Sequence, residues 1–473
     1  MSERLGPDDP YQLTEAAVLE PPTSLFGRLK YLGPGLILSA SIVGSGELIA
    51  TTALGAKAGF VCLWVILVSC LVKVALQLEF GKHTISSGET TMEALNSLPG
   101  PRIGKAGWPI WTWLGLMFFK FLQVGGILGL SAMAAHMVFP AVAQNVWVFV
   151  LAILVALLVF TGRYALIEKT CITLIGIFTL LVFIALGKVI GLGEAPPLSA
   201  ETAVHLPNVL SGLTFNPAVL EGAILGVAIA AFGITGVGGD EIMHYNYWLL
   251  EKGYASKTGA RPKGGGSDWT RRARGWIGIM HLDALLSMVV YTVMTVAFYL
   301  LGASLLRGSG DDIGEGVKLL ENLSAMFTET FGPGARLVFL GGAFMVLFST
   351  LLAALGALSR TYADAFSQLG LYNFRNPAHR SRWIAILSFV IPTIWAAAFF
   401  LFKEPKAMIL LGGAATSVML LIVVAAAIYF HFKRIPGELA PKIFYRVAFW
   451  VSVIAILTLS LKVAVETALK LST

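Results

Sequence analysis

Long apolar segments recur along the whole chain and constrain its fold more than any other feature. A helix needs about 20 mostly apolar residues to cross the hydrocarbon core of a bilayer. Of the 473 residues, 56% are hydrophobic and only 13% are charged, which is typical of a polytopic membrane protein. The sequence therefore predicts an all-α membrane protein with 11 transmembrane helices. The predicted spans are 31–57, 60–81, 108–138, 143–162, 165–190, 219–250, 275–304, 333–359, 383–403, 406–432 and 444–469.

The distribution of basic residues predicts how the chain is oriented in the membrane. The loop 251–274 contains seven Lys or Arg residues, whereas the loop 191–218 contains none. Basic loops stay in the cytosol. We therefore expect a cytosolic N-terminal tail (1–30), an external loop at 191–218, and a C-terminus outside. The tail lacks the order of a signal peptide, and we expect an integral protein of a bacterial inner membrane.

Several classes of protein and of site are excluded by composition and motifs. Cys62, Cys70 and Cys171 all lie in apolar runs, which excludes a disulfide framework and a thiolate metal site. The basic residues lie in short loops, so a nucleic-acid partner is not expected. The expected partner of the chain is the lipid bilayer. There is no nucleotide-binding loop, no His-Glu-x-x-His motif, and no nucleophile with a base at a readable spacing. We therefore expect neither an enzyme nor a cofactor.

Two of the predicted spans contain glycine clusters that are followed at once by acidic residues. The first span reads IVGSGE (Ile42 to Glu47), and the sixth reads GITGVGGDEIMHYN (Gly233 to Asn246). Each glycine lowers helix stability by about 1 kcal/mol relative to alanine, which favours a broken helix at both places. The alternative is that the glycines allow close helix packing.

The pairing of the two clusters indicates a transporter. Spans one and six each open one half of a five-plus-five arrangement, 31–190 and 219–432, which the segment 433–473 follows with a cytosolic loop and the last helix. Interrupted helices at matching positions in two halves mark the binding site of many secondary transporters. Carboxylates within spans usually face a partner, a cavity or an ion. We therefore expect Glu47 and Asp240, with Glu241 beside them, to face one pocket that binds a divalent cation.

The first span also resembles a known family. The order Gly33-Pro34-Gly35, then Ser39, then Gly46 is similar to the first helix of the Nramp (natural resistance-associated macrophage protein) family of divalent metal transporters. The hallmark of that helix is Gly-Pro-Gly followed by Asp-Pro-Gly-Asn. The resemblance places Gly44 at the metal-binding Asp and Glu47 at the ligand Asn. It spans helices one to ten and implies a LeuT-like 5+5 inverted-repeat fold with broken helices 1 and 6.

The sixth span carries the same resemblance with further substitutions. The family has Gly-Ala and then Met-Pro-His-Asn, and a gapless match places Gly239 and Asp240 on Gly-Ala, Met243 on the methionine and Asn246 on the asparagine. The resemblance thus implies that Asp240 replaces an Ala that lends its carbonyl. It also implies that Met243 keeps the soft sulfur ligand and that His244 replaces the proline.

In the third span, Lys120 and Gln123 replace family acids that are tied to proton movement. Glutamine has no proton to exchange near neutral pH, and the ordinary pKa of a lysine side chain is about 10.4. We therefore expect the usual proton coupling to be absent, or to be carried by another residue such as His244. Three interpretations of Lys120 remain open: it pairs with a carboxylate, snorkels toward the cytosol, or attracts an anionic substrate.

These observations predict a secondary-active transporter that moves a divalent cation of the Mg²⁺ or Mn²⁺ class by alternating access. One alternative is a transporter of the same fold for an organic or anionic solute, because helix N-termini at such breaks favour anions. A second is an intramembrane metalloenzyme that uses Asp240 and Glu241. The expected substrate-binding residues are Gly44, Glu47, Asp240, Glu241, Met243 and His244, with Lys120 and Gln123 on the coupling pathway.

Overall fold

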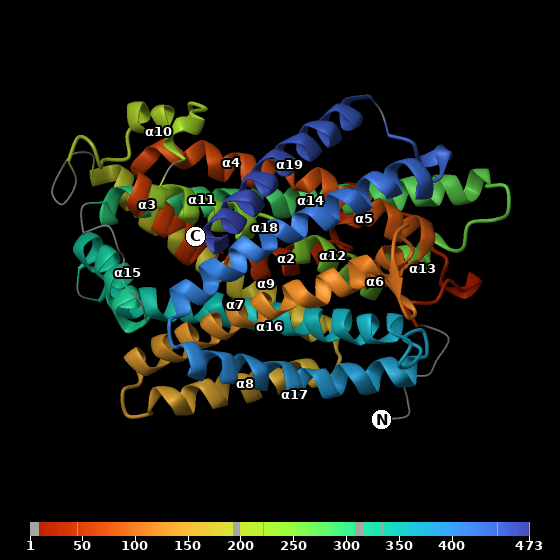
Figure 1. Cartoon of the computed structure of the whole chain (residues 1–473), viewed down its shortest axis with the longest axis horizontal. Helices are drawn as coiled ribbons and strands as arrows, with labels where there is room; N and C mark the ends of the chain where they lie inside the picture. Colours follow the sequence, from red (N-terminus) through yellow and green to blue (C-terminus); the bar gives the residue numbers. More distant parts are fainter. Residues whose placement is uncertain are drawn as a thin grey trace.

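Helices make up most of this computed structural model, which describes residues 9–44, 46–192, 199–220, 222–307, 314, 316–332, 334–441 and 443–472. The strands found in these ranges form one antiparallel hairpin of β1 (Arg102–Ile103) and β2 (Ala106–Gly107). In its register Arg102 lies opposite Gly107, and Ile103 lies opposite Ala106. The remaining architecture is a bundle of long helices (Figure 1).

The α-helices of the first half of the chain are α1 (Leu25–Leu29), α2 (Pro34–Ile42), α3 (Thr52–Ala58), α4 (Leu63–Val72), α5 (Val74–Ser87), α6 (Thr91–Asn96), α7 (Trp108–Val138), α8 (Gln144–Phe160), α9 (Tyr164–Leu192) and α10 (Leu206–Leu213). Those of the second half are α11 (Gly222–Ile234), α12 (Gly239–Glu251), α13 (Tyr254–Thr258), α14 (Ser267–Leu301), α15 (Gly316–Phe331), α16 (Ala335–Gln368), α17 (Pro377–Phe402), α18 (Pro405–Tyr429) and α19 (Ile443–Ser472). Short π-helical turns extend this set as η2 (Gly46–Thr51), η5 (Gly302–Leu306) and η6 (Phe430–Arg434), and 3₁₀ turns as η1 (Glu15–Ala17), η3 (Gly59–Cys62), η4 (Pro217–Val219) and η7 (Gly437–Leu439).

Every predicted span contains helical structure in its described residues. By length and apolarity, 8 helical segments within the described residues qualify to cross a membrane. The first of them, Pro34–Ser87, is 54 residues long and covers two predicted spans, while Gln144–Phe160 and Ile443–Leu459 are shorter apolar helices. The all-α membrane class is therefore confirmed, and the number of 11 spans, the boundaries of the two repeats and the orientation stay predictions.

Both predicted helix breaks are confirmed. In the first span, α2 ends at Ile42 and helical structure resumes as η2 at Gly46. In the sixth span, α11 ends at Ile234 and α12 begins at Gly239, with four residues of non-helical backbone between them. The glycines at these places thus interrupt the helices, and some of them also permit close packing, as shown for the site below.

One element extends well beyond its predicted span. Hydropathy predicts that the seventh span begins at 275, but α14 begins at Ser267, so its first turns lie in the basic loop. Asp268 lies in the first turn, where the helix dipole favours an acid, and Arg271 and Arg272 are good helix formers. Hydropathy alone locates the apolar part of a helix and therefore misses such a polar extension.

The third predicted span, α7, lies at the centre of one side of the bundle, packed against α8, α16, α17 and α18 (Figure 1). Its glycines permit this closeness. A Cβ on Gly125 would lie 2.8 Å from the carbonyl oxygen of Trp395 in α17, and one on Gly126 would lie 2.8 Å from that of Pro405 in α18. This packing fixes the helix that carries Lys120 and Gln123.

A buried carboxylate anchors the start of the first broken helix. Asp283 of α14 accepts hydrogen bonds from the backbone amides of Gly33 at 2.9 Å and Gly35 at 2.6 Å, which precede or begin α2. The hydroxyl of Tyr245 in α12 donates to the same carboxylate at 2.9 Å. These amides have no partner within their own helix, so Asp283 satisfies them and ties α2, α12 and α14 together.

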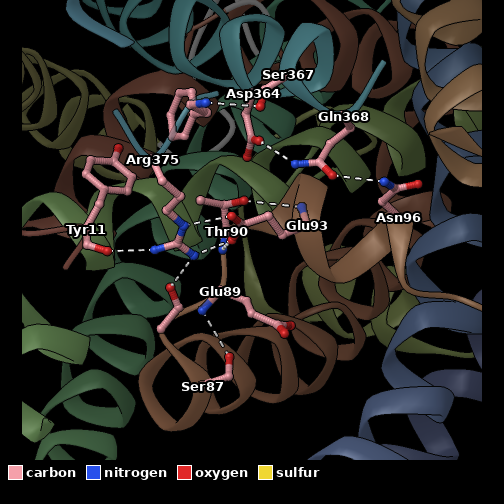
Figure 2. A network of polar contacts seen from close by, with 12 residues as sticks. Tyr11, Ser87, Glu89, Thr90, Glu93, Asn96, Asp364, Ser367, Gln368 and Arg375 are labelled. Atoms are coloured by element: carbon pink, nitrogen blue, oxygen red, sulfur yellow. Dashed lines mark hydrogen bonds and ion pairs between the residues drawn. The ribbon is translucent and has the colours of Figure 1, made fainter. Parts of the chain in front are cut away.

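The N-terminal tail is bound across one end of the bundle. Arg375, between α16 and α17, donates to the carbonyl oxygens of Tyr11 at 2.6 Å and Gly88 at 3.0 Å (Figure 2). Its Nε also donates to Glu93 of α6 at 2.7 Å. The Tyr11 hydroxyl in turn donates to Glu251, at the end of α12, at 3.0 Å. One guanidinium therefore joins the tail to two other segments, and the tail reaches the sixth span.

A second ion pair at this end joins α5 to the end of the tenth span. Glu89 pairs with Arg434 of η6 and lies 3.0 Å from Nε2 of His83. Burial raises the pKa of Glu89, but the His83 hydrogen bond and the charges of His83 and Arg434 outweigh it, so that the pKa lies below its usual value. A carboxyl with a lowered folded-state pKa stabilises the fold above its unfolded pKa of about 4.3, and this contribution is lost as the pH falls through the folded value.

We predict that Arg375→Ala lowers the free energy of unfolding by about 1–3 kcal/mol, because it leaves partly buried acceptors without their charged donor. Arg375→Lys keeps the charge but not the fork of donors, so its effect should be intermediate. Thermal unfolding of the purified protein and the rate of tryptic cleavage within the tail are the measurements. Arg382→Ala, at an exposed position of α17, is the control. Wild-type behaviour of Arg375→Ala in both measurements would show that the tail contact contributes nothing.

Candidate cation-binding site

The break in the first helix lies directly against the break in the sixth. A Cβ on Gly44 would lie 1.8 Å from Oγ1 of Thr350 in α16, and one on Gly46 would lie 2.9 Å from the carbonyl oxygen of Ile234. Neither position has room for a side chain, which explains glycine at both. Ile234 is the last residue of α11. The two interrupted helices therefore meet at their breaks.

Glu47 follows the first break and has no exposed surface. Its Oε1 accepts a hydrogen bond from the Thr295 hydroxyl of α14 at 2.9 Å. The turn that carries Glu47, η2, also packs against α11 of the sixth helix. The Oε2 of Glu47 has no hydrogen-bond partner among the described residues. Glu47 is thus held between α14 and the sixth helix, with one oxygen available to another ligand.

The second break requires glycine for its backbone conformation as well as for space. Gly236 has a φ of +62°, in the left-handed region that favours glycine, and a Cβ there would lie 2.9 Å from Cα of Cys70. Gly238 caps α12, whose first turn contains Asp240 and Glu241. The positive end of the helix dipole favours acidic residues in that turn. The second break therefore places two carboxylates next to buried, non-helical backbone.

Lys120 of α7 binds both carboxylates. Its Nζ lies 2.6 Å from Oδ2 of Asp240 and 3.2 Å from Oε1 of Glu241. All three side chains are buried, at 6%, 0% and 7% exposure for Lys120, Asp240 and Glu241. A buried charge is costly unless it is paired. Of the three interpretations of Lys120, the structure shows pairing with a carboxylate.

A second buried lysine, Lys73, satisfies the backbone at the second break. It lies at the junction of α4 and α5, and its Nζ donates to the carbonyl oxygens of Phe232 and Thr235, at 2.6 Å each. The Ser69 hydroxyl, one turn earlier, lies 3.0 Å from the same two oxygens. Lys73 has no exposed surface. The carbonyls that α11 leaves unpaired are therefore bound by an ammonium group.

The other expected site residues lie around this centre with fewer contacts. His244 interacts electrostatically with Asp240 and Lys120, and its Nε2 has no hydrogen-bond partner in the described ranges. Met243 is fully buried, and its carbonyl accepts from the Thr91 hydroxyl at 2.8 Å. These contacts assign no ligand role to either side chain.

Gln123, one turn beyond Lys120 on α7, packs on the tenth predicted span. A Cβ on Gly412 of α18 would lie 2.3 Å from Cβ of Gln123. The Oε1 of Gln123 has no hydrogen-bond partner among the residues that the structure describes. Gln123 therefore lies in a close helix contact, at the place where the family resemblance implies an acid.

Sequence reasoning missed Lys73 and Thr295. The signal for Lys73 was present, because an ionisable residue in the middle of a predicted span (60–81) indicates a functional partner. Thr295 gave no such signal, since single threonines are common in membrane helices. Its role follows only from the contact between α14 and η2.

The donors at the breaks are distributed rather than clustered. Within the described residues, no group of three or more His, Cys, Asp and Glu side chains is arranged to hold a metal ion. Three carboxylates, from Glu47, Asp240 and Glu241, lie at the starts of η2 and α12. With the two lysines charged and all three acids ionised, the formal charge of this group is −1. A cation that binds here has to use carboxylate and backbone oxygens, the donors that hard cations prefer.

A helical membrane protein with two broken helices that meet among buried charges has the architecture of a transporter. A family model described as natural resistance-associated macrophage protein-like matches residues 35–466. The chain therefore belongs to the Nramp family, whose members are transporters and not enzymes.

Relatives and solved structures agree with this assignment. The divalent metal cation transporter MntH of Levilactobacillus brevis is 23% identical over 447 residues, or 93% of this chain and 89% of the relative. A mutant of the manganese transporter of Eremococcus coleocola aligns with a TM-score of 0.65 at 15% identity, over 95% of this chain and 90% of that one. Mhp1, a nucleobase-cation-symport-1 family transporter, aligns with a TM-score of 0.54 at 14% identity, over 93% of each chain. The predicted LeuT-like fold is thereby confirmed.

We predict that Gly233→Ala, next to the last residue of α11, disrupts the second break. A Cβ there would lie 1.9 Å from the carbonyl oxygen of Gly413, so α11 has to move away from α18. Overpacking of this kind costs about 1–3 kcal/mol, and we expect lower thermal stability together with reduced uptake in liposomes. Gly226→Ala is the matched control, because it lies on the same helix with nothing within 4 Å of its added Cβ. Equal behaviour of the two variants would contradict the close contact between the helices.

Proposed function

We propose that the chain is a secondary-active transporter of a divalent metal cation of the Mg²⁺ or Mn²⁺ class, working by alternating access. The observation that carries this proposal is the contact between the two breaks, with Glu47 beside one and Asp240 and Glu241 beside the other. Membership of the family supports it, as does the name of the Levilactobacillus brevis relative, a divalent metal cation transporter.

The lysine contacts suggest how such a cation would enter. Lys120 pairs with both Asp240 and Glu241, and carboxylates are also strong oxygen donors for a metal ion. A divalent cation therefore has to displace the Lys120 ammonium from at least one carboxylate. In this proposal the substrate-free state is the one with Lys120 paired, and the substrate-bound state has Lys120 turned away.

We expect Glu47→Gln and Asp240→Asn each to lower divalent cation uptake by about tenfold or more while the protein still folds. Each substitution removes one buried negative charge from the site, and a tenfold change corresponds to about 1.4 kcal/mol. Uptake of Mg²⁺ and Mn²⁺ into proteoliposomes is the measurement, with thermal unfolding to verify the fold. Glu201→Gln, at an exposed loop position, is the control. Wild-type uptake in both site variants would remove these residues from the site.

Transport is proposed to run without the proton route of the family. Gln123 has no proton to exchange, and Lys120 is held by two carboxylates. In liposomes that contain a pH-sensitive dye, we expect cation uptake without acidification of the interior. Substrate-dependent acidification that disappears in Lys120→Gln would show that Lys120 carries protons, and acidification that disappears in His244→Gln would assign this role to His244.

A second candidate function is transport of an organic or anionic solute. It is favoured by one observation, the two buried ammonium groups of Lys73 and Lys120 at the second break. A panel of labelled divalent cations, amino acids and organic anions in the same liposomes distinguishes the two candidates. Accumulation of an anion, with no metal uptake, would replace the first proposal by the second.

A further inference from the structure

The contacts of Lys73 differ in kind from those of Lys120. Lys120 is bound by carboxylates, whereas Lys73 donates hydrogen bonds to two neutral carbonyl oxygens, those of Phe232 and Thr235. The Phe232 ring adds a cation–π contact, with its centroid 4.9 Å from Nζ. The ammonium group is thus surrounded by backbone oxygens and an aromatic face, as a bound free cation would be.

The position of these carbonyls explains why they need a cation. The last carbonyl groups of α11 have no partner further along their own helix, and inside a membrane water is not available to satisfy them. The C-terminal end of a helix also carries the negative end of its dipole, which attracts positive charge. Unwound carbonyls and helix C-termini at such breaks are the groups that coordinate coupling cations in transporters of this architecture.

We propose that Lys73 is a tethered cation, whose ammonium group fills the carbonyl site at the second break and makes transport independent of any monovalent co-ion. Lys73 is then a specificity-determining residue, because it leaves only the carboxylate side of the breaks to a free cation. The part of this inference that concerns transport rests on the proposed function. The part that concerns occupation of the carbonyl site does not.

The structure also supplies a control for Lys73. The Ser69 hydroxyl lies 3.0 Å from the same two carbonyl oxygens, with one proton to donate and no charge. Ser69→Ala removes a hydrogen-bond donor and keeps the ammonium group. Lys73→Ala removes the cation and leaves space beside the carbonyls, where a small cation could bind.

The first experiment compares thermal unfolding of wild type, Lys73→Ala and Ser69→Ala in chlorides of ammonium, methylammonium, potassium, sodium and choline at equal ionic strength. We expect the melting temperature of Lys73→Ala to fall below wild type, and to rise by about 2 °C or more with ammonium or potassium but not with choline. Wild type and Ser69→Ala should show no difference among the salts. Equal melting temperatures of Lys73→Ala in all five salts would overturn the proposal.

A second experiment does not depend on the folding of Lys73→Ala. Wild-type uptake of the divalent cation is measured with sodium, potassium or choline as the other cation, and equal rates are expected. A requirement for sodium or potassium would overturn the independence from a co-ion. In Lys73→Gln, whose amide donates hydrogen bonds without charge, a stable protein with at least about a tenfold loss of uptake is expected, because the charge is missing. Wild-type uptake in Lys73→Gln would show that the charge is not needed.

The two proposals fail in different ways. If wild type moves no divalent cation in any salt, the proposed function fails, while the cation-selective rise of the Lys73→Ala melting temperature still tests whether Lys73 occupies a cation site. If uptake of the divalent cation is robust but requires sodium or potassium, the proposed function stands and the tethered cation is rejected.

Discussion

Buried charge and unpaired backbone at the two helix breaks have to be satisfied by the protein itself, and the rest of the structure depends on how this is done. Two lysines from different helices meet this need in different ways. Lys120 of α7 balances the carboxylates that start α12, and Lys73 binds the carbonyls that end α11. Because an unpaired charge or carbonyl in the membrane interior costs several kcal/mol, α4, α7 and the sixth helix are bound into one arrangement.

The ion pair of Lys120 and Asp240 relates two of the positions at which this chain differs from the family pattern. The resemblance implies acids on the third helix and a neutral Ala on the sixth, whereas this chain has Lys120 on the third and Asp240 on the sixth. The two substitutions have opposite signs, and the structure brings them to 2.6 Å. They are best explained together, as an exchange of charge across one helix contact. Lys120 thus offsets part of the negative charge that Asp240 adds. The acid that the resemblance expects at Gly44 is absent from this chain.

The sequence contains enough information for the breaks but not for their partners. Glycine at Gly44, Gly46 and Gly236 acts locally, through the space and the backbone angles that it permits, so the interruption of both helices could be predicted from the residues themselves. Which charge meets which depends on the register between helices that are far apart in sequence. For that reason the pairing of Lys120 was one of three interpretations, and the contacts of Lys73 were not predicted. Hydropathy likewise predicts the apolar parts of the spans but not the polar first turns of α14.

The anchor at Asp283 has a mechanical consequence. One carboxylate holds the amides of Gly33 and Gly35 and the Tyr245 hydroxyl, so the first half of helix one, the second half of helix six and the seventh helix share a single joint. A swing of α2 alone would break the two hydrogen bonds from the Gly33 and Gly35 amides to the buried Asp283 carboxylate. A movement of all three helices together keeps these hydrogen bonds to Asp283 intact. This joint therefore favours a movement of α2, α12 and α14 as one block over a bend in α2 alone.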